Sequence, residues 1–264
     1  MPKIFRLPFA RERLRFSLLL FRVTSYDGYS HEKLVVDFVG HLGRSKMTDE
    51  LPIADVPSGF FEYHADFKEP VFFPWFGKDA PTGGMYKTLM PWGLELNRVA
   101  FNTNPKTLQD IQTSFSTTNP PVVVNLGLGS LAFIVQNADW SQAPVLIPML
   151  EAVLTHVKAA IPTEVHLQTT VLGFHVKPGP KPFRETMQQF INAKALGADG
   201  TENYGLVLYG PTYTILIDRS LAIPDGLFVK ITRVFPAETL ISEMASIMWK
   251  DEEEFLHRLG FRTQ

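Results

Sequence analysis

Three strand-like runs separated by two turn sequences make up residues 204–235, YGLVLYGPTYTILIDRSLAIPDGLFVKITRVF. Apolar, β-branched and aromatic residues dominate each run, as is typical of strands. The separators, Gly210-Pro211 and Pro224-Asp225-Gly226, are residue combinations that favour tight turns. The stretch therefore predicts an antiparallel meander of three strands, Tyr204–Tyr209, Tyr213–Arg219 and Leu227–Phe235.

Helical and strand patterns surround this meander. Apolar residues recur at helical spacing over residues 146–157 and 181–197, and two further helical pieces are expected at 240–248 and after an Asp251–Glu254 capping arrangement. Three more apolar runs predict strands, Val122–Leu126, Leu131–Val135 and Val165–Val176. Strands in runs without strict βαβ alternation predict an α+β fold. We expect antiparallel or mixed sheets with helices packed on one face, and a C-terminal β-meander followed by helices.

The N-terminal part of the chain has weaker patterns. Residues 13–24 favour a strand, residues 30–43 place apolar side chains at helical spacing and predict a helix, and residues 86–101 predict one or two strands. The small, polar and proline-ended segment SFSTTNPP, residues 114–121, indicates a boundary. We therefore predict an aromatic-rich N-terminal α+β region, residues 1–118, and a C-terminal α+β region, residues 119–264. The alternative is one continuous domain.

Composition limits the classes of function. The 264 residues are 45% hydrophobic and 20% charged, which is typical of soluble globular proteins. A net charge of −2 gives no overall attraction to nucleic acid, and the absence of cysteine excludes disulfides and thiolate chemistry. No apolar run reaches the roughly 20 residues of a membrane span or the roughly 7–15 of a secretory signal. We expect a cytoplasmic protein without membrane or nucleic-acid partners.

Glu62, His64 and Asp66 are the candidate catalytic residues. They are spaced by two in the segment GFFEYHADF, residues 59–67, so their side chains share one face if the segment is a strand. Imidazole and carboxylate groups on one face can bind a metal ion. The alternative is a polar strand face beside an aromatic core face, with no cofactor.

The triplet His64-Ala65-Asp66 resembles the HxD element of the iron(II)/2-oxoglutarate oxygenases. The resemblance implies a metal site completed by a distal histidine, for which His175 is the candidate, and Arg184 as the anchor for 2-oxoglutarate. It covers these four residues and no more of the chain. The family also carries its anchor on a strand of a jelly roll, whereas Arg184 lies in a predicted helix.

Aromatic residues are the most unusual feature of the composition. The chain has 21 Phe and 4 Trp, and they are densest from Phe60 to Phe76, continuing to Trp92. Those that do not fit in the core can line an apolar pocket between sheet and helices or form a patch that binds a partner. The candidate ligand-binding residues are Phe72, Phe73, Trp75, Phe76 and Trp92.

The leading hypothesis is a non-enzymatic binding or assembly protein that needs no cofactor. Its expected partner is another protein or a second copy of this chain, with a small apolar ligand as a further candidate. The hypothesis from another class is a metal-dependent enzyme of the oxygenase type, acting at the face of Glu62, His64 and Asp66.

Overall fold

The computed structural model describes residues 18–24, 30–36, 53–72, 80–102, 104–107, 110–177, 183–188 and 205–262. Its strands are β1 Leu18–Thr24, β2 Ser30–Val36, β3 Asp55–Phe67, β4 Val99–Phe101, β5 Gln112–Ser116, β6 Val122–Gly127, β7 Ser130–Gln136, β8 Val165–Lys177, β9 Leu206–Tyr209, β10 Tyr213–Arg219 and β11 Leu227–Pro236. Its α-helices are α1 Pro81–Leu89, α2 Ala143–Ala160, α3 Phe183–Gln188 and α4 Ile241–Arg258.

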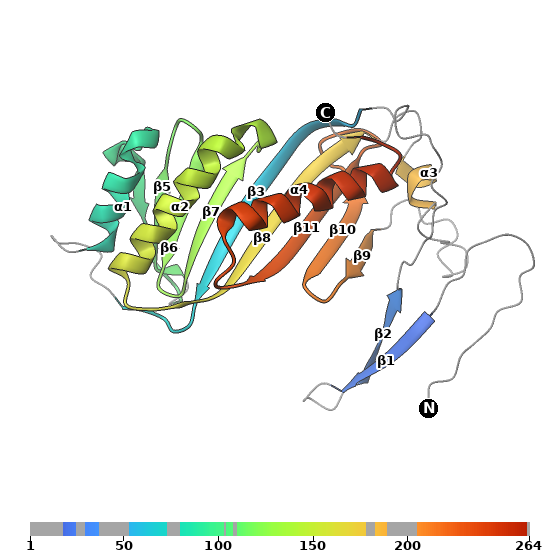
Figure 1. Cartoon of the computed structure of the whole chain (residues 1–264), viewed down its shortest axis with the longest axis horizontal. Coiled ribbons are helices and arrows are strands. Elements are labelled where there is room, and N and C mark those ends of the chain that lie inside the picture. The colour runs from blue at the N-terminus through green and yellow to red at the C-terminus, as the bar shows by residue number, and fades with distance from the viewer. Residues whose placement is uncertain are drawn as a thin grey trace, which may run out of the picture.

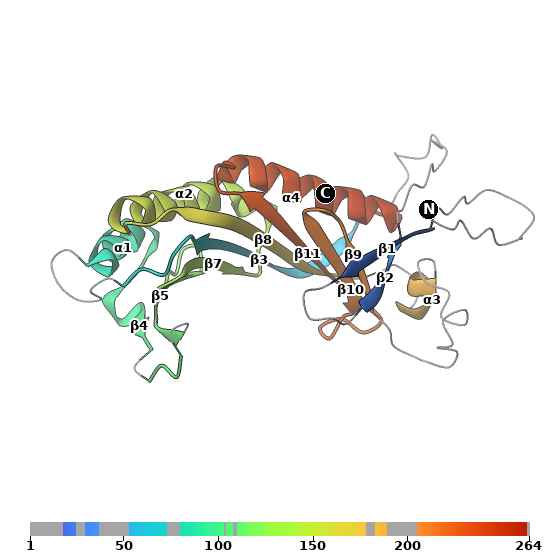
Figure 2. The ribbon, with the colours of Figure 1, turned by 90° about the horizontal axis from the view of Figure 1, so that it is seen from below.

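Nine of the strands form one antiparallel sheet in the order β4-β5-β6-β7-β3-β8-β11-β10-β9, and β1 pairs with β2 apart from it (Figure 1). Helices α1, α2 and α4 lie along one side of this sheet, and the sheet curves away from them at both ends (Figure 2). The α+β prediction is therefore confirmed, with a strand run and then a helix at the C-terminal end.

The order of elements repeats once along the chain. After β3 come α1, antiparallel strands ending in β7, and α2; after β8 come α3, antiparallel strands ending in β11, and α4. β3 and β8 have 13 residues each, and α2 and α4 have 18 each. Because β3 and β8 pair antiparallel at the centre of the sheet, an approximate two-fold axis relates the halves. It brings α2 and α4 into contact above the central strand pair.

The two central strands separate a covered face from an open face. On β3, Tyr63 and Ala65 are fully buried beneath the helices, whereas Glu62 and His64 are about one-third exposed. Successive side chains of a strand point to opposite sides, so this alternation assigns residues 58–66 of β3, between its two register shifts, to one face or the other. We call the helix side the covered face and the other side the open face.

Two N-terminal predictions were wrong. The first seven residues of the predicted helix 30–43 form strand β2, and the remainder lies outside the described residues. Within 86–101, predicted as strand, the chain completes α1, makes 3₁₀ turns at Met90–Trp92 and Leu96–Arg98, and is extended only in β4. Pro81 lies in the first turn of α1, a position that favours a helix start. The strand prediction over 86–101 relied on the apolar pattern and did not use this signal.

The C-terminal helix is continuous, which corrects the prediction of two pieces. Asp251 lies inside α4 and forms a bidentate ion pair with Arg233 of β11, with N···O distances of 2.6 and 2.8 Å. Both side chains are less than one-quarter exposed. The acidic segment that resembles a helix cap therefore attaches the middle of α4 to the sheet.

The nine-stranded sheet includes strands from both predicted regions. β5 and β6 lie on either side of the predicted boundary at residue 118 and pair directly, with Ser116 opposite Val123. The division of the chain into two regions at residue 118 therefore stays a prediction. The strands on either side of residue 118 belong to one continuous sheet.

The segment Trp140–Ala160 is long and apolar enough to cross a membrane by length and composition, with a mean hydropathy of 1.3. Its helical part, α2, buries one face against the sheet. The buried residues are Leu146, Met149, Leu150, Val153, Leu154 and Val157. Packing on the sheet therefore gives a second physical reason for the apolar composition.

Candidate functional site

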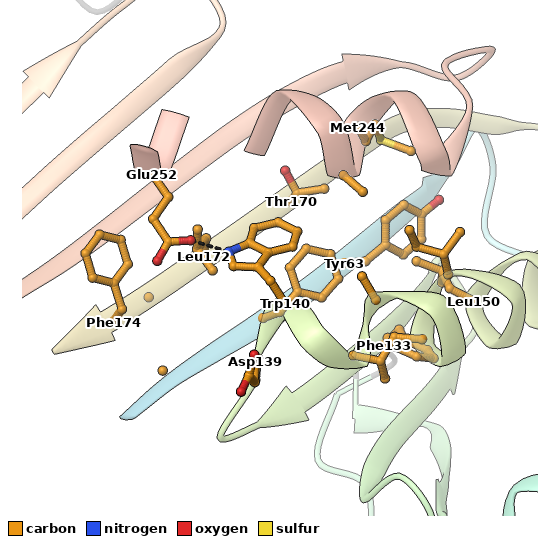
Figure 3. A pocket seen from close by; sticks show the side chains of 18 of the residues that line it. Tyr63, Phe133, Asp139, Trp140, Leu150, Thr170, Leu172, Phe174, Met244 and Glu252 are labelled. Atoms are coloured by element: carbon orange, nitrogen blue, oxygen red, sulfur yellow. Dashed lines mark hydrogen bonds between the residues drawn. The ribbon is translucent and has the colours of Figure 1, made fainter. Parts of the chain in front are cut away.

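A cavity of about 80 Å³ lies on the covered face, between the central strands and helices α2 and α4 (Figure 3). It is partly open to solvent rather than enclosed, and its walls are almost entirely apolar. Aromatic and aliphatic side chains from both halves of the chain form these walls. They include Phe61, Phe133, Trp140, Leu150, Leu172, Phe174, Ile241 and Met244.

Two carboxyl groups lie among these apolar walls. Glu252 of α4 is only 8% exposed, and its carboxylate accepts a hydrogen bond from the indole N–H of Trp140, as Figure 3 shows. Burial raises the pKa of Glu252, the bond from Trp140 opposes that rise, and the nearby charge of Asp139 adds to it. Asp139 is exposed and caps the turn at Trp140–Gln142 by accepting from the backbone N–H of Ser141.

A third polar group belongs to a residue that lines the cavity. The hydroxyl oxygen of Thr170, on β8, is buried and makes no hydrogen bond within the described part of the chain, and the residue is 1% exposed. A buried hydroxyl without a partner costs roughly 1–3 kcal/mol relative to one that is bonded. Thr170 is among the residues whose side chains form the cavity wall.

One wall of the cavity is fixed by a buried hydrogen-bond network. The Tyr63 hydroxyl donates to Oε1 of Gln168 at 2.6 Å, and Nε2 of Gln168 lies 2.9–3.0 Å from the carbonyl oxygens of Pro236, Ala237 and Thr239. Burial raises the pKa of Tyr63, so this hydroxyl keeps its proton. The network ties β3 and β8 to the segment that leads into α4, and it holds the cavity's shape.

No protein-family model matches this chain, and no curated protein is similar to it in sequence. Several solved structures resemble it loosely, two of which are the following. The rolling circle replication initiator protein from Geobacillus stearothermophilus is 10% identical, covering 79% of this chain and 85% of its own, with a TM-score of 0.36. The TBP of Methanococcus jannaschii is 11% identical, covering 76% and 96%, with a TM-score of 0.27. At these TM-scores neither likeness carries an argument about fold or function.

The predicted catalytic residues Glu62, His64 and Asp66 lie together on the open face of β3, as their spacing requires. Nε2 of His64 is 2.9 Å from Oε2 of Glu62, and Asp66 is exposed. In the register of β3 with β8, His175 lies opposite Ser58, whereas His64 lies opposite Thr169. The structure therefore does not bring His175 to the other two.

The metal implied by the oxygenase resemblance does not fit this arrangement. Among the residues that the structure describes, no group of three His, Cys, Asp or Glu side chains is placed to bind a metal ion. His175 instead packs its ring against Phe228, and its Nδ1 is 2.9 Å from the Ser220 hydroxyl. Arg184 lies in the short helix α3 rather than on a strand.

The predicted aromatic ligand-binding residues are only partly described. Phe72 is 72% exposed, and Trp92, in a 3₁₀ turn after α1, packs at the edge of the core. Phe73, Trp75 and Phe76 lie outside the described residues. Binding of a protein partner through this surface stays a prediction.

The residues that give the cavity its chemistry were not among the predicted site residues. Glu252 falls within the Asp251–Glu254 segment that was predicted as a helix cap. It follows Met248 by four positions and precedes Phe255 by three, and all three are buried. A glutamate in register with an apolar helical stripe was the available signal.

Proposed function

We propose that this protein is a non-enzymatic binding protein that takes a small, largely apolar molecule into the cavity between β3, β8, α2 and α4. The observation that carries the proposal is the cavity itself, about 80 Å³ in volume, apolar in its walls and open on one side. A water molecule needs roughly 10–15 Å³ of such space. The cavity therefore has room for a short branched hydrocarbon group.

The physical driving force is the burial of apolar surface. A preformed apolar cavity with a few polar groups is the usual form of a small-molecule site. Here the hydrogen bonds of Tyr63 and Gln168 preform one wall, and the contact of α2 with α4 forms another. A molecule that enters replaces poorly bonded water by protein contacts, and each buried CH₂ group contributes about 0.8 kcal/mol.

The experiment is a titration with 3-methylbutan-1-ol followed by NMR of methyl groups. Signals of Leu150 and Met244 are expected to shift on binding, because both side chains line the cavity. The variant Ala245→Leu places a larger side chain at the cavity wall and should weaken binding about tenfold, the effect of roughly 1.4 kcal/mol.

The matched control is Ala159→Leu, because Ala159 is exposed on α2 and does not line the cavity. It should bind the alcohol as the unmodified protein does. Absence of cavity-specific shifts in the unmodified protein, or equal binding in Ala245→Leu, contradicts the proposal. A thermal unfolding curve for each variant verifies that it is folded.

A further inference from the structure

The charged residues that line the cavity are of one sign. Asp139 and Glu252 are among its lining residues, and no described Lys, Arg or His is. In the part of the chain that the structure describes, neither carboxylate forms an ion pair. The arginine in the neighbouring ion pair, Arg233, is already engaged by both oxygens of Asp251. Within the described part of the chain, the two carboxyl groups of the cavity therefore have no cationic side chain to balance them.

The placement of Glu252 is energetically unfavourable in the empty cavity. A carboxylate that is only 8% exposed loses much of its hydration, and the single hydrogen bond from Trp140 returns part of that loss. Asp139 increases the cost, because two like charges raise each other's energy. A bound cation would remove both penalties at once.

Two further groups suit a cationic ligand. The unpartnered hydroxyl of Thr170 is an acceptor in the same cavity, separate from the carboxyl groups. The indole of Trp140 also lines the cavity, and the face of a tryptophan ring attracts an organic cation. An ammonium group has three N–H donors, so it can bond to more than one of these oxygens.

We infer that the ligand is a small organic amine, bound as its cation, with the ammonium group near Glu252 and Asp139 and a short apolar body against the cavity walls. The inference rests on the proposed function, since it assigns the ligand's chemical class to the same cavity. A structural role for Glu252, fastening α4 to Trp140, requires its hydrogen bond but no preference for cations.

The test compares three probes with the same branched carbon chain: 3-methylbutylamine, 3-methylbutan-1-ol and 3-methylbutanoate, each titrated into the whole protein by calorimetry and NMR at neutral pH. The amine should bind about tenfold or more tightly than the alcohol, because a charge-assisted hydrogen bond contributes roughly 1.5–3 kcal/mol. The carboxylate should bind most weakly. In Thr170→Val, which removes the hydroxyl but keeps the shape, amine affinity should fall by a factor of a few.

Glu252→Gln keeps the side-chain size and removes the charge, so the amine and the alcohol should then bind within about threefold of each other. The control is Glu253→Gln, the same change at the next, exposed residue of α4, which should keep the full preference. Equal binding of amine and alcohol by the unmodified protein overturns the inference and leaves the cavity-binding function in place. Failure of all three probes to bind overturns both.

Discussion

The two faces of β3 and β8 differ in how much their chemistry depends on the rest of the molecule. On the open face, Glu62 and His64 are near each other because they are two residues apart on one strand, and both remain about one-third exposed. On the covered face, Thr170 and Glu252 are 82 positions apart in sequence, and only packing places them in one cavity. The predicted site at Glu62, His64 and Asp66 therefore lies on the open face, where water competes with each side-chain contact.

The largest expected effect concerns the packing of a buried ring on the covered face, compared with an exposed ring in the segment that follows β3. Phe133→Ala removes a fully buried ring from the covered face and should lower the free energy of unfolding by about 3–5 kcal/mol. Phe72→Ala, at a site that is 72% exposed, should change it by less than about 0.5 kcal/mol. Urea denaturation of both variants measures the contrast. Equal effects would mean that Phe133 is not in the core.

Ion pairs give the next contrast. Asp251→Asn breaks the bidentate pair with Arg233, whose side chains are largely buried, and should cost about 1.5–3 kcal/mol. Glu62→Gln changes the partner of His64, which is about one-third exposed, and should cost less than about 1 kcal/mol. Urea denaturation of the two variants measures the contrast, and equal losses would contradict it.

Glycine substitutions compare a ring fixed by a hydrogen bond with a partly exposed ring that is only stacked on a neighbour. A Cβ at Gly84, in α1, would clash with the ring of His156, which is hydrogen-bonded to the Pro81 carbonyl, so Gly84→Ala should cost about 1–3 kcal/mol. A Cβ at Gly173 would clash with the ring of Phe60, which lies on the open face stacked on Phe228. Because a shift of that ring breaks no hydrogen bond, Gly173→Ala should cost less than about 1 kcal/mol.

Gly83 provides the control for the first of these changes. It is the helical neighbour of Gly84, and an added Cβ there meets nothing within 4 Å. Gly83→Ala should raise the free energy of unfolding by about 0.5–1 kcal/mol, because alanine favours the helix. A loss of stability in Gly83→Ala, or none in Gly84→Ala, would contradict the packing of α1 on α2.

The smallest expected effects are pH dependences of opposite sign. The pKa of Glu252 is raised, so its stabilising contribution is present below the carboxyl range of the unfolded chain and is lost as the pH rises through the raised pKa. The groups that act on Glu252 are Asp139 and Trp140. The stability of Glu252→Gln relative to the unmodified protein, measured from unfolding curves, should therefore increase as the pH rises.

Burial lowers the pKa of His175 on the open face. The contribution of His175 to stability is present above the usual pKa of histidine in the unfolded chain, and it is lost as the pH falls from that value to the lowered pKa. His175→Gln should thus remove part of the stability lost between neutral and mildly acidic pH. A His175→Gln variant that keeps the full pH dependence of the unmodified protein would contradict this assignment.

Local sequence predicted the strands and helices of the C-terminal half well. β6 to β11 and α2 lie where the apolar runs and turns placed them, because Gly and Pro separate many of these elements. Helix α3 lies within the predicted helix 181–197, and residues 189–197 of that prediction lie outside the described residues. It failed at residues 30–36, where Leu34, Val35 and Val36 fit a helical stripe as well as a strand. Short apolar runs do not distinguish the two structures until a pairing partner is known.

The sequence by itself determined the fold class, the strand at residues 165–176 and, once residues 59–67 form a strand, the shared face of Glu62, His64 and Asp66, since these follow from local pattern and spacing. Only the tertiary structure decided that β3 and β8 pair at the centre, that α2 and α4 meet above them, and that Glu252 and Thr170 share a cavity. Those contacts join segments far apart in the chain, and burial of apolar surface rather than any local motif selects them.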